Sequence, residues 1–151
     1  AGHPLGGLVL YPPLAEKAGL GWHGAHGLLI TPEHGPRVRL TAIYTNIENL
    51  PFFDEKNNPH KWIEDFCVRC NRCIRKCPSW AIYETNQSIK HDNGLITHIN
   101  NDKCFPVFLE YWACSICIKE CVFNRINYSI LKKGYDKNNN LTHTEIDELI
   151  D

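Results

Sequence analysis

Hydrophobic and polar positions alternate most clearly over residues 37–45. The apolar positions on one side of this stretch are Val38, Leu40, Ala42 and Tyr44. A period of two residues is typical of a half-buried β-strand, so we predict a strand here. The apolar residues 28–30 predict a second short strand or extended segment, and residues 31–36 predict a turn. Further upstream, prolines at the start and a glycine at the stop predict a short helix over residues 12–18.

The last residues, 136–151, combine an Asn-rich stretch with a short acidic segment. Thr142 and Glu145 have the spacing of a capping box, which predicts a linker followed by a short helix. A calcium-binding loop that starts at Asp136 is the alternative, although Leu141 stands where such a loop needs a glycine.

The composition is that of a soluble globular protein, with 43% hydrophobic and 22% charged residues. A formal net charge of −1 argues against a nucleic-acid-binding protein, whose binding face would be basic. No apolar run reaches the roughly 18–20 residues that a transmembrane segment needs. The sequence contains no methionine, so we expect Ala1 not to be a translation start, and any targeting signal would precede it.

The strongest chemical signal comes from eight cysteines, all between residues 67 and 121. The first four are Cys67, Cys70, Cys73 and Cys77, with Pro78 after them. Their spacing, C-x2-C-x2-C-x3-C-P, is that of the cysteines that bind [4Fe–4S] clusters in bacterial two-cluster ferredoxins. The two-residue gaps bend the backbone around one face of the cube, and the fourth cysteine binds the other cluster.

The last four cysteines are Cys104, Cys114, Cys117 and Cys121. Their C-x2-C-x3-C core is intact, while the leading cysteine is displaced upstream. If the ligands cross as in two-cluster ferredoxins, cluster A is held by Cys67, Cys70, Cys73 and Cys121. Cluster B is then held by Cys77, Cys104, Cys114 and Cys117. This assignment uses all eight cysteines.

Two other uses of the cysteines remain alternatives. A structural zinc site could join Cys67 and Cys70 to Cys114 and Cys117, but the other four cysteines would then need a second site. A disulfide framework is compatible with the even count, but cysteines two residues apart pair awkwardly.

Residues 61–76, around the first cysteines, carry a local charge of +3. This basic charge could offset the negative charge of a thiolate-bound cluster. It could also form a docking face for an acidic electron donor such as a ferredoxin or flavodoxin.

Residues 19–27 contain four glycines. They could cradle a phosphate, but they follow a helix and lack the Lys-Ser/Thr of a P-loop, so a tight loop is the simpler interpretation. His23 and His26 are three residues apart and could bind a metal, although a loop pair of this kind is more often solvent-facing or bonded to the backbone.

Residues 15–24, AEKAGLGWHG, and residues 27–40, GLLITPEHGPRVRL, resemble the corrinoid-binding portion of reductive dehalogenases. The AGLGW stretch also resembles epoxyqueuosine reductases, which share that fold. In both families it precedes a C-x2-C-x2-C-x3-C-P run and then a lone cysteine before a final C-x2-C-x3-C, as here. The resemblance covers residues 5–125.

The resemblance implies a cobalamin whose cobalt is reduced by the nearer cluster, which is fed in turn by the outer one. The residues expected to face the corrinoid are Gly19, Leu20, Gly21, Trp22, His23, Gly24, Gly27, Leu28, Leu29 and Ile30. In reductive dehalogenases the catalytic tyrosine and much of the corrinoid pocket lie upstream of this region. The resemblance therefore implies a C-terminal portion that is truncated at its N-terminus, with a partner chain completing the pocket.

Taken together, these patterns predict an α+β protein with three parts. Residues 1–60 would form a corrinoid-facing or docking segment, part of a corrinoid-binding α/β unit. Residues 61–130 would form a two-[4Fe–4S] bacterial ferredoxin-like domain, and residues 131–151 a linker and short acidic helix.

The expected function is electron transfer to a corrinoid in a reductive-dehalogenase-like oxidoreductase. The alternatives are a cobalamin reductase or trafficking protein, and a ferredoxin-type subunit of a larger redox complex without corrinoid. Thiolate clusters favour the cytoplasm, whereas an upstream signal would make the protein exported and membrane-associated.

Overall fold

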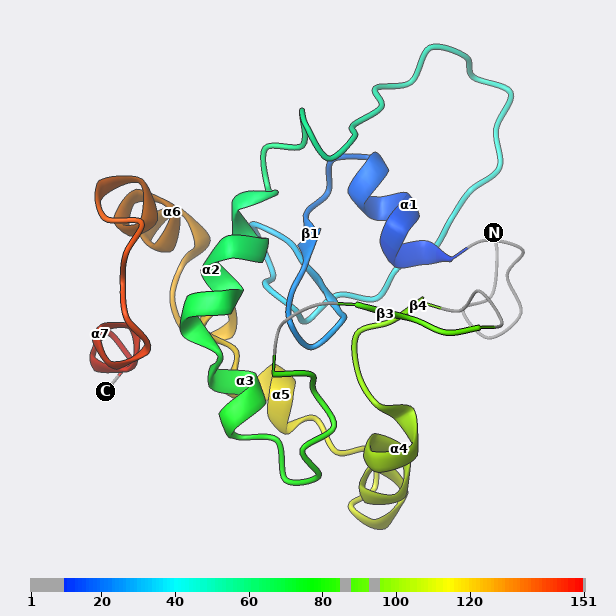
Figure 1. The fold of residues 1–151 in the computed structure, drawn as a ribbon. Helices are drawn as coiled ribbons and strands as arrows, with labels where there is room; N and C mark the ends of the chain where they lie inside the picture. Colours follow the sequence, from blue (N-terminus) through cyan, green and yellow to red (C-terminus); the bar gives the residue numbers. More distant parts are fainter. Residues whose placement is uncertain (1–9, 85–87, 93–95, 151) are drawn as a thin grey trace.

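The computed structural model describes residues 10–84, 88–92 and 96–150, which form short helices and two small antiparallel sheets (Figure 1). The helices are α1 (Tyr11–Lys17), α2 (Trp62–Cys70), α3 (Arg72–Arg75), α4 (Asn101–Glu110), α5 (Ile116–Glu120), α6 (Tyr128–Lys137) and α7 (His143–Glu148), with a 3₁₀ turn, η1, at Val122–Asn124. One sheet pairs β1 (Trp22–His23) with β2 (Leu29–Ile30), and the other pairs β3 (Ile89–Lys90) with β4 (Ile96–Thr97). The predicted α+β class is confirmed at this level. No helix among the described residues has the length and apolar character to cross a membrane.

Helix α2 supplies the centre of the core because its apolar residues repeat at helical spacing. The buried positions are Trp62, Ile63, Phe66, Cys67 and Cys70. The ring of Trp62 lies 5.2–5.7 Å, centroid to centroid, from four other aromatic rings. Those rings belong to Phe66, Phe123, Tyr128 and Tyr135. The Trp62 indole N–H also donates a hydrogen bond of 2.8 Å to the Tyr128 hydroxyl, so the polar atom of this central ring is paired.

Helix α7 begins at a capping box and packs on this core through one buried side chain. The predicted capping box is present: the Thr142 hydroxyl accepts from the Glu145 amide, and the Glu145 carboxylate accepts from the Thr142 amide. Ile146 has no exposed surface. Residues 131–137, where we expected the linker to begin, instead continue α6.

The predicted strand over residues 37–45 is wrong. These residues run in an extended arm that arches away from α1, shown in cyan in Figure 1, and no described segment pairs with it. The alternation survives as a burial pattern, with Val38, Leu40 and Ala42 half-buried and the residues between them exposed. A β-strand exists only in a hydrogen-bonded pair, so the pattern identified part of the less exposed face, with Tyr44 exposed, but could not supply the partner.

The other elements near the N-terminus follow the sequence patterns. The helix predicted over 12–18 is α1, with prolines in its first turn, and the extended segment predicted over 28–30 contains β2. The turn predicted over 31–36 closes through reciprocal backbone hydrogen bonds between Thr31 and Gly35, at 3.0 and 2.9 Å.

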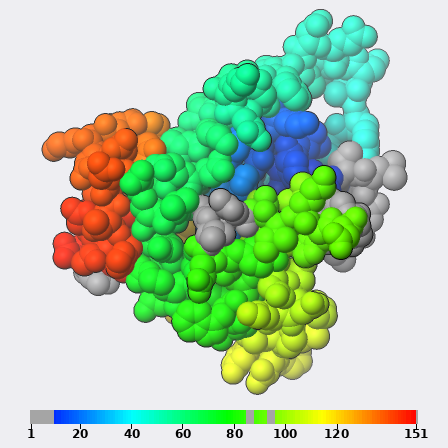
Figure 2. Space-filling view, in the orientation of Figure 1, coloured from blue at the N-terminus to red at the C-terminus, as the bar shows by residue number. Residues whose placement is uncertain are grey.

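Helix α4 lies apart from the core and buries none of its side chains (Figure 2, yellow). Its exposed apolar residues include Phe105 and Leu109, and Trp112 just beyond its end is 94% exposed. Asn100 caps the helix by accepting a hydrogen bond from the Lys103 amide. The cap, rather than packing, therefore defines where this helix starts.

Candidate cysteine centres and the adjoining apolar cavity

Four of the eight cysteines line one small buried cavity. They are Cys67, Cys70, Cys73 and Cys121, each between 6% and 8% exposed. Asn71, with a left-handed φ of 36°, ends α2 and starts α3, so the chain turns sharply between Cys70 and Cys73. Cys121 arrives from the other side, directly after α5. The turn and the end of α5 bring together thiols that are up to 54 residues apart in the sequence.

The environment of these four thiols combines burial with backbone donors. Burial is the largest cause that raises the pKa of Cys67, Cys70, Cys73 and Cys121. Backbone amides oppose the shift through hydrogen bonds: that of Ala25 to Cys67, of Ile74 to Cys73 and of Phe123 to Cys121. Amide hydrogen bonds to sulfur are what a metal-bound thiolate needs in a buried site, because they stabilise its negative charge.

The other four cysteines form a second, less buried group. Cys104 interacts electrostatically with Cys77 and Cys114, and Cys117 with all three. Burial is the main cause that raises the pKa of Cys117 to about 11. At Cys77 burial also raises the pKa, but hydrogen bonds from the Ser79 hydroxyl and from backbone amides outweigh it, so the pKa lies below its usual value. One of these is the Ala81 amide, 3.4 Å from the Cys77 sulfur.

The grouping bears on the alternatives for the cysteines. All eight are free thiols in the structure. The zinc alternative needed Cys67 and Cys70 beside Cys114 and Cys117, whereas the former pair lines a cavity with Cys73 and Cys121. Within the described residues, no three Cys, His, Asp or Glu side chains converge tightly enough for a single metal ion.

A buried arginine ties α3, which carries Cys73, to α5 and α7. Arg72 on α3 is 9% exposed and pairs with Glu120 on α5 at 3.1 Å and with Asp147 on α7 at 2.7 Å. Arg75 adds a second bond to Asp147 at 2.8 Å. Arg72 and Arg75 thus pair with carboxylates outside residues 61–76, whereas Lys61 and Arg69 pair with Glu64 and Asp65 within that segment.

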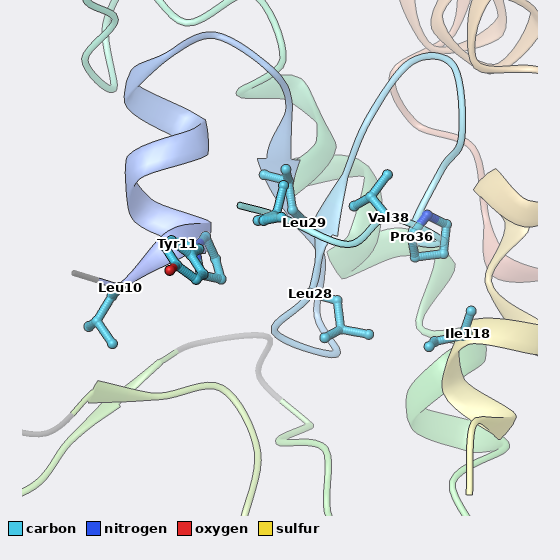
Figure 3. A pocket seen from close by; sticks show the side chains of 9 residues that line it. Leu10, Tyr11, Leu28, Leu29, Pro36, Val38 and Ile118 are labelled. Atoms are coloured by element: carbon cyan, nitrogen blue, oxygen red, sulfur yellow. The ribbon is translucent and has the colours of Figure 1, made fainter. Parts of the chain in front are cut away.

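The ten residues expected to face a corrinoid do not form one surface. Leu28 and Leu29 line an apolar cavity of about 370 Å³, together with Leu10, Tyr11, Pro12, Pro36, Val38, Leu40 and Ile118 (Figure 3). Trp22 and His23 line a different cavity of about 280 Å³ beside Phe52 and Phe53. Gly21, Gly24 and Ile30 pack within the β1–β2 hairpin, Gly19 against Phe53 and Gly27 against His98, while Leu20 is half exposed.

Several residues around the 370 Å³ cavity were not singled out from the sequence. Tyr11 has a buried hydroxyl without a hydrogen-bond partner, and Ile118 reaches the cavity from α5. Val38 and Leu40 belong to the arm whose alternating pattern had indicated that one of its faces would be buried. No local pattern marked Tyr11 or Ile118, because their role depends on how distant elements pack.

Three histidines, His23, His26 and His98, lie close together at the β1–β2 hairpin. His23 pairs with Glu16 at 2.6 Å, and its ring lies 4.6 Å from that of His98. His26 is 4% exposed, and burial, with smaller contributions from His23 and His98, lowers its pKa to about 4. The sequence left open whether His23 and His26 bind a metal. The structure gives each a protein partner: His26 Nδ1 accepts from the Leu28 amide at 3.1 Å.

Comparison with known proteins finds relatives over most of this chain. No family model matches the chain. The tetrachloroethene reductive dehalogenase of Sulfurospirillum multivorans is 36% identical over 125 residues, which cover 75% of this chain and 23% of that protein. An epoxyqueuosine reductase of Bacillus cereus is 40% identical over 120 residues, which cover 74% of this chain and 29% of that protein.

The fold comparison agrees with the sequence comparison. A solved structure of a variant of the catabolic reductive dehalogenase NpRdhA superimposes with a TM-score of 0.58 and 27% identity, covering 82% of this chain and 18% of that one. The matched part of this chain thus spans between 18% and 29% of the length of these relatives. Over most of its length, this chain is homologous to one portion of the reductive dehalogenases and of the related epoxyqueuosine reductases.

Proposed function

We propose that this chain carries two [4Fe–4S] clusters and relays single electrons to a corrinoid centre in a reductive-dehalogenase-like oxidoreductase. Cluster A would be bound by Cys67, Cys70, Cys73 and Cys121, and cluster B by Cys77, Cys104, Cys114 and Cys117. The observation that carries the proposal is the cavity that Cys67, Cys70, Cys73 and Cys121 line together, with the other four thiols close enough to interact electrostatically with one another and, through Cys117, with Cys73 and Cys121. A bound [4Fe–4S] cluster takes up and releases one electron at a time.

The direction of electron flow follows from burial. The thiols proposed for cluster A are all buried, whereas Cys104, Cys114 and Cys117 are only half-buried. Electrons from an external donor such as a ferredoxin or flavodoxin would therefore enter at cluster B. Cluster A lies against the β1–β2 hairpin, part of the segment proposed to face the corrinoid, and would be the last relay.

The apolar cavity in Figure 3 has the chemistry of one wall of a corrinoid pocket. Its volume of about 370 Å³ is at the small end of ligand sites, which run from about 300 to 1,000 Å³. Its lining is apolar, with one buried hydroxyl, on Tyr11, that has no partner in the described structure. Leu28 and Leu29, already proposed as corrinoid contacts, would pack on the macrocycle.

The rest of the pocket would come from a partner chain. In the described part of the chain, residues 38–46 donate no backbone hydrogen bond, although Val38 and Leu40 line the cavity. A β-strand from the partner could pair with this edge and close the open side of the cavity.

In this proposal, residues 1–60 would form a corrinoid-facing segment, residues 61–130 a cluster domain and residues 131–151 a C-terminal part. Eight free thiols suit a reducing compartment, so we propose the cytoplasm as the site where the clusters are built.

The metal content of anaerobically purified protein tests this function. Two clusters require about eight iron atoms per chain, and a retained corrinoid adds about one cobalt. Iron without cobalt would support the electron-transfer role and leave the corrinoid to a partner. Zinc in place of iron would refute the proposal.

Serine substitutions test how the cysteines are divided. Cys121→Ser should impair cluster A alone, and Cys77→Ser cluster B alone, because each removes one of four ligands. Electron paramagnetic resonance of the reduced protein would report which cluster is lost. The crossed assignment is excluded if Cys121→Ser removes the signal that Cys104→Ser also removes.

A further inference from the structure

The turn between β1 and β2 directs two consecutive residues inward. The Gly24 amide donates to the Leu28 carbonyl at 3.0 Å, and the Gly27 amide donates to the Gly24 carbonyl at 2.8 Å. Gly27 has a φ of 74°, a left-handed conformation that glycine adopts without strain. The tight turn leaves Ala25 and His26 each only 4% exposed.

The proton on the His26 ring can be placed from its hydrogen bond. Nδ1 accepts from the Leu28 amide at 3.1 Å, so Nδ1 is unprotonated and the neutral ring carries its hydrogen on Nε2. Gly24 packs against this ring, since a side chain there would meet Cε1 at 3.0 Å. The ring is therefore held in one orientation by the turn itself.

The Nε2 donor is buried and has no partner among the described residues. A buried donor without an acceptor destabilises the folded protein, so such a group calls for an explanation. His26 lines the same cavity as Cys67, Cys70, Cys73 and Cys121. The neighbouring residue of the turn, Ala25, already donates its amide to the Cys67 sulfur.

We infer that His26 Nε2–H donates a hydrogen bond to a sulfur of the iron–sulfur cluster held by those four cysteines, and so raises that cluster's reduction potential. The inference rests on the proposed function. A reduced cluster carries one more negative charge than an oxidised one, and a fixed N–H donor stabilises the more negative state. In this inference His26 changes the reduction potential of the cluster through a hydrogen bond and does not ligate iron.

Two substitutions separate the hydrogen bond from the space that the ring fills. His26→Leu removes the donor, whereas His26→Gln keeps an N–H at the reach of Nε2. His98→Leu is the matched control, because His98 packs on the same hairpin through Gly27 but does not line the cavity. All three would be made in the full chain with clusters loaded anaerobically.

A redox titration followed by electron paramagnetic resonance gives the primary result. In His26→Leu we expect the reduced-to-oxidised ratio of one cluster to fall about tenfold at fixed potential, which is a shift of 59 mV for one electron. His26→Gln should recover most of this loss, and His98→Leu should leave both clusters unchanged. Equal potentials in wild-type and His26→Leu protein, with both clusters present, overturn the inference but not the proposed function.

A measurement on unmutated protein covers the case in which His26→Leu does not fold. Wild-type chain labelled with ¹⁵N-histidine should show coupling of a histidine nitrogen to one reduced cluster in pulsed resonance spectra. The absence of that coupling overturns the inference. If wild-type chain binds no cluster at all, the proposed function falls as well.

Discussion

At the residue scale, two residues shape the site that Cys67, Cys70, Cys73 and Cys121 line. Asn71 supplies the left-handed turn between α2 and α3, and Arg72 joins three helices through Glu120 and Asp147. A buried arginine left without its partners is costly, so its acidic neighbours matter more than exposed carboxylates do. Neither role was readable in the sequence, where Arg72 was one of five basic residues and a candidate for a docking face.

Asp147→Asn should lower the free energy of unfolding by about 1–2 kcal/mol at pH 7, because it removes charged hydrogen bonds to Arg72 and Arg75. Partial burial raises the pKa of Asp147, but these arginines outweigh burial and hold the pKa below its usual range. A lowered pKa adds stability above the unfolded pKa of about 3.9, and that stability is lost as the pH falls. Urea unfolding at pH 7, 4 and 2.5 should show a difference that persists down to about pH 4 and shrinks below it, where the carboxyl group becomes protonated in the folded state as well.

Asp136→Asn serves as the control for this prediction. Asp136 pairs with Lys132 on the exposed face of α6, so its loss should cost less than about 1 kcal/mol. If Asp147→Asn lowers the free energy of unfolding by the same amount at pH 2.5 as at pH 7, the role assigned to the carboxylate charge is contradicted.

At the element scale, the sequence predicted what local interactions determine. The proline start of α1, the Thr31–Gly35 turn and the capping box of α7 all follow from neighbouring residues. The strand at residues 37–45 failed because pairing is a property of two segments. The inward direction of His26 was missed for a related reason, since it depends on how the β1–β2 hairpin packs on α2.

Ile146→Ala should lower the free energy of unfolding by about 2–4 kcal/mol, because the side chain is fully buried and its loss leaves a cavity. Leu149→Ala, at a site that is 59% exposed, should change it by less than about 0.5 kcal/mol. Equal effects in denaturant unfolding would mean that α7 does not dock through Ile146.

At the scale of the whole molecule, the described residues form a core around Trp62 with two extensions. One is the arm over residues 37–50, cyan at the upper right of Figure 2, and the other is α4. Both expose apolar side chains, among them Ile43, Ile47 and Phe105.

The amides of residues 38–46 should exchange with deuterium at rates close to those of an unfolded chain, because none of them donates a backbone hydrogen bond to any residue in 10–84, 88–92 or 96–150. The amides of α2 provide the protected reference in the same experiment. Addition of a strand-forming partner should slow exchange at alternate amides of the arm. Strong protection in the isolated chain would show that these amides are already paired.

Helix α4 has a consequence for the order in which the protein matures. The helix carries Cys104 but buries none of its own side chains, so few packing forces hold that thiol near Cys77. In the proposed assignment, ligation of iron by Cys104 would connect α4 to the rest of the molecule. Cluster B would then be filled after cluster A during biogenesis, and under air or chelators it would be the first to be lost.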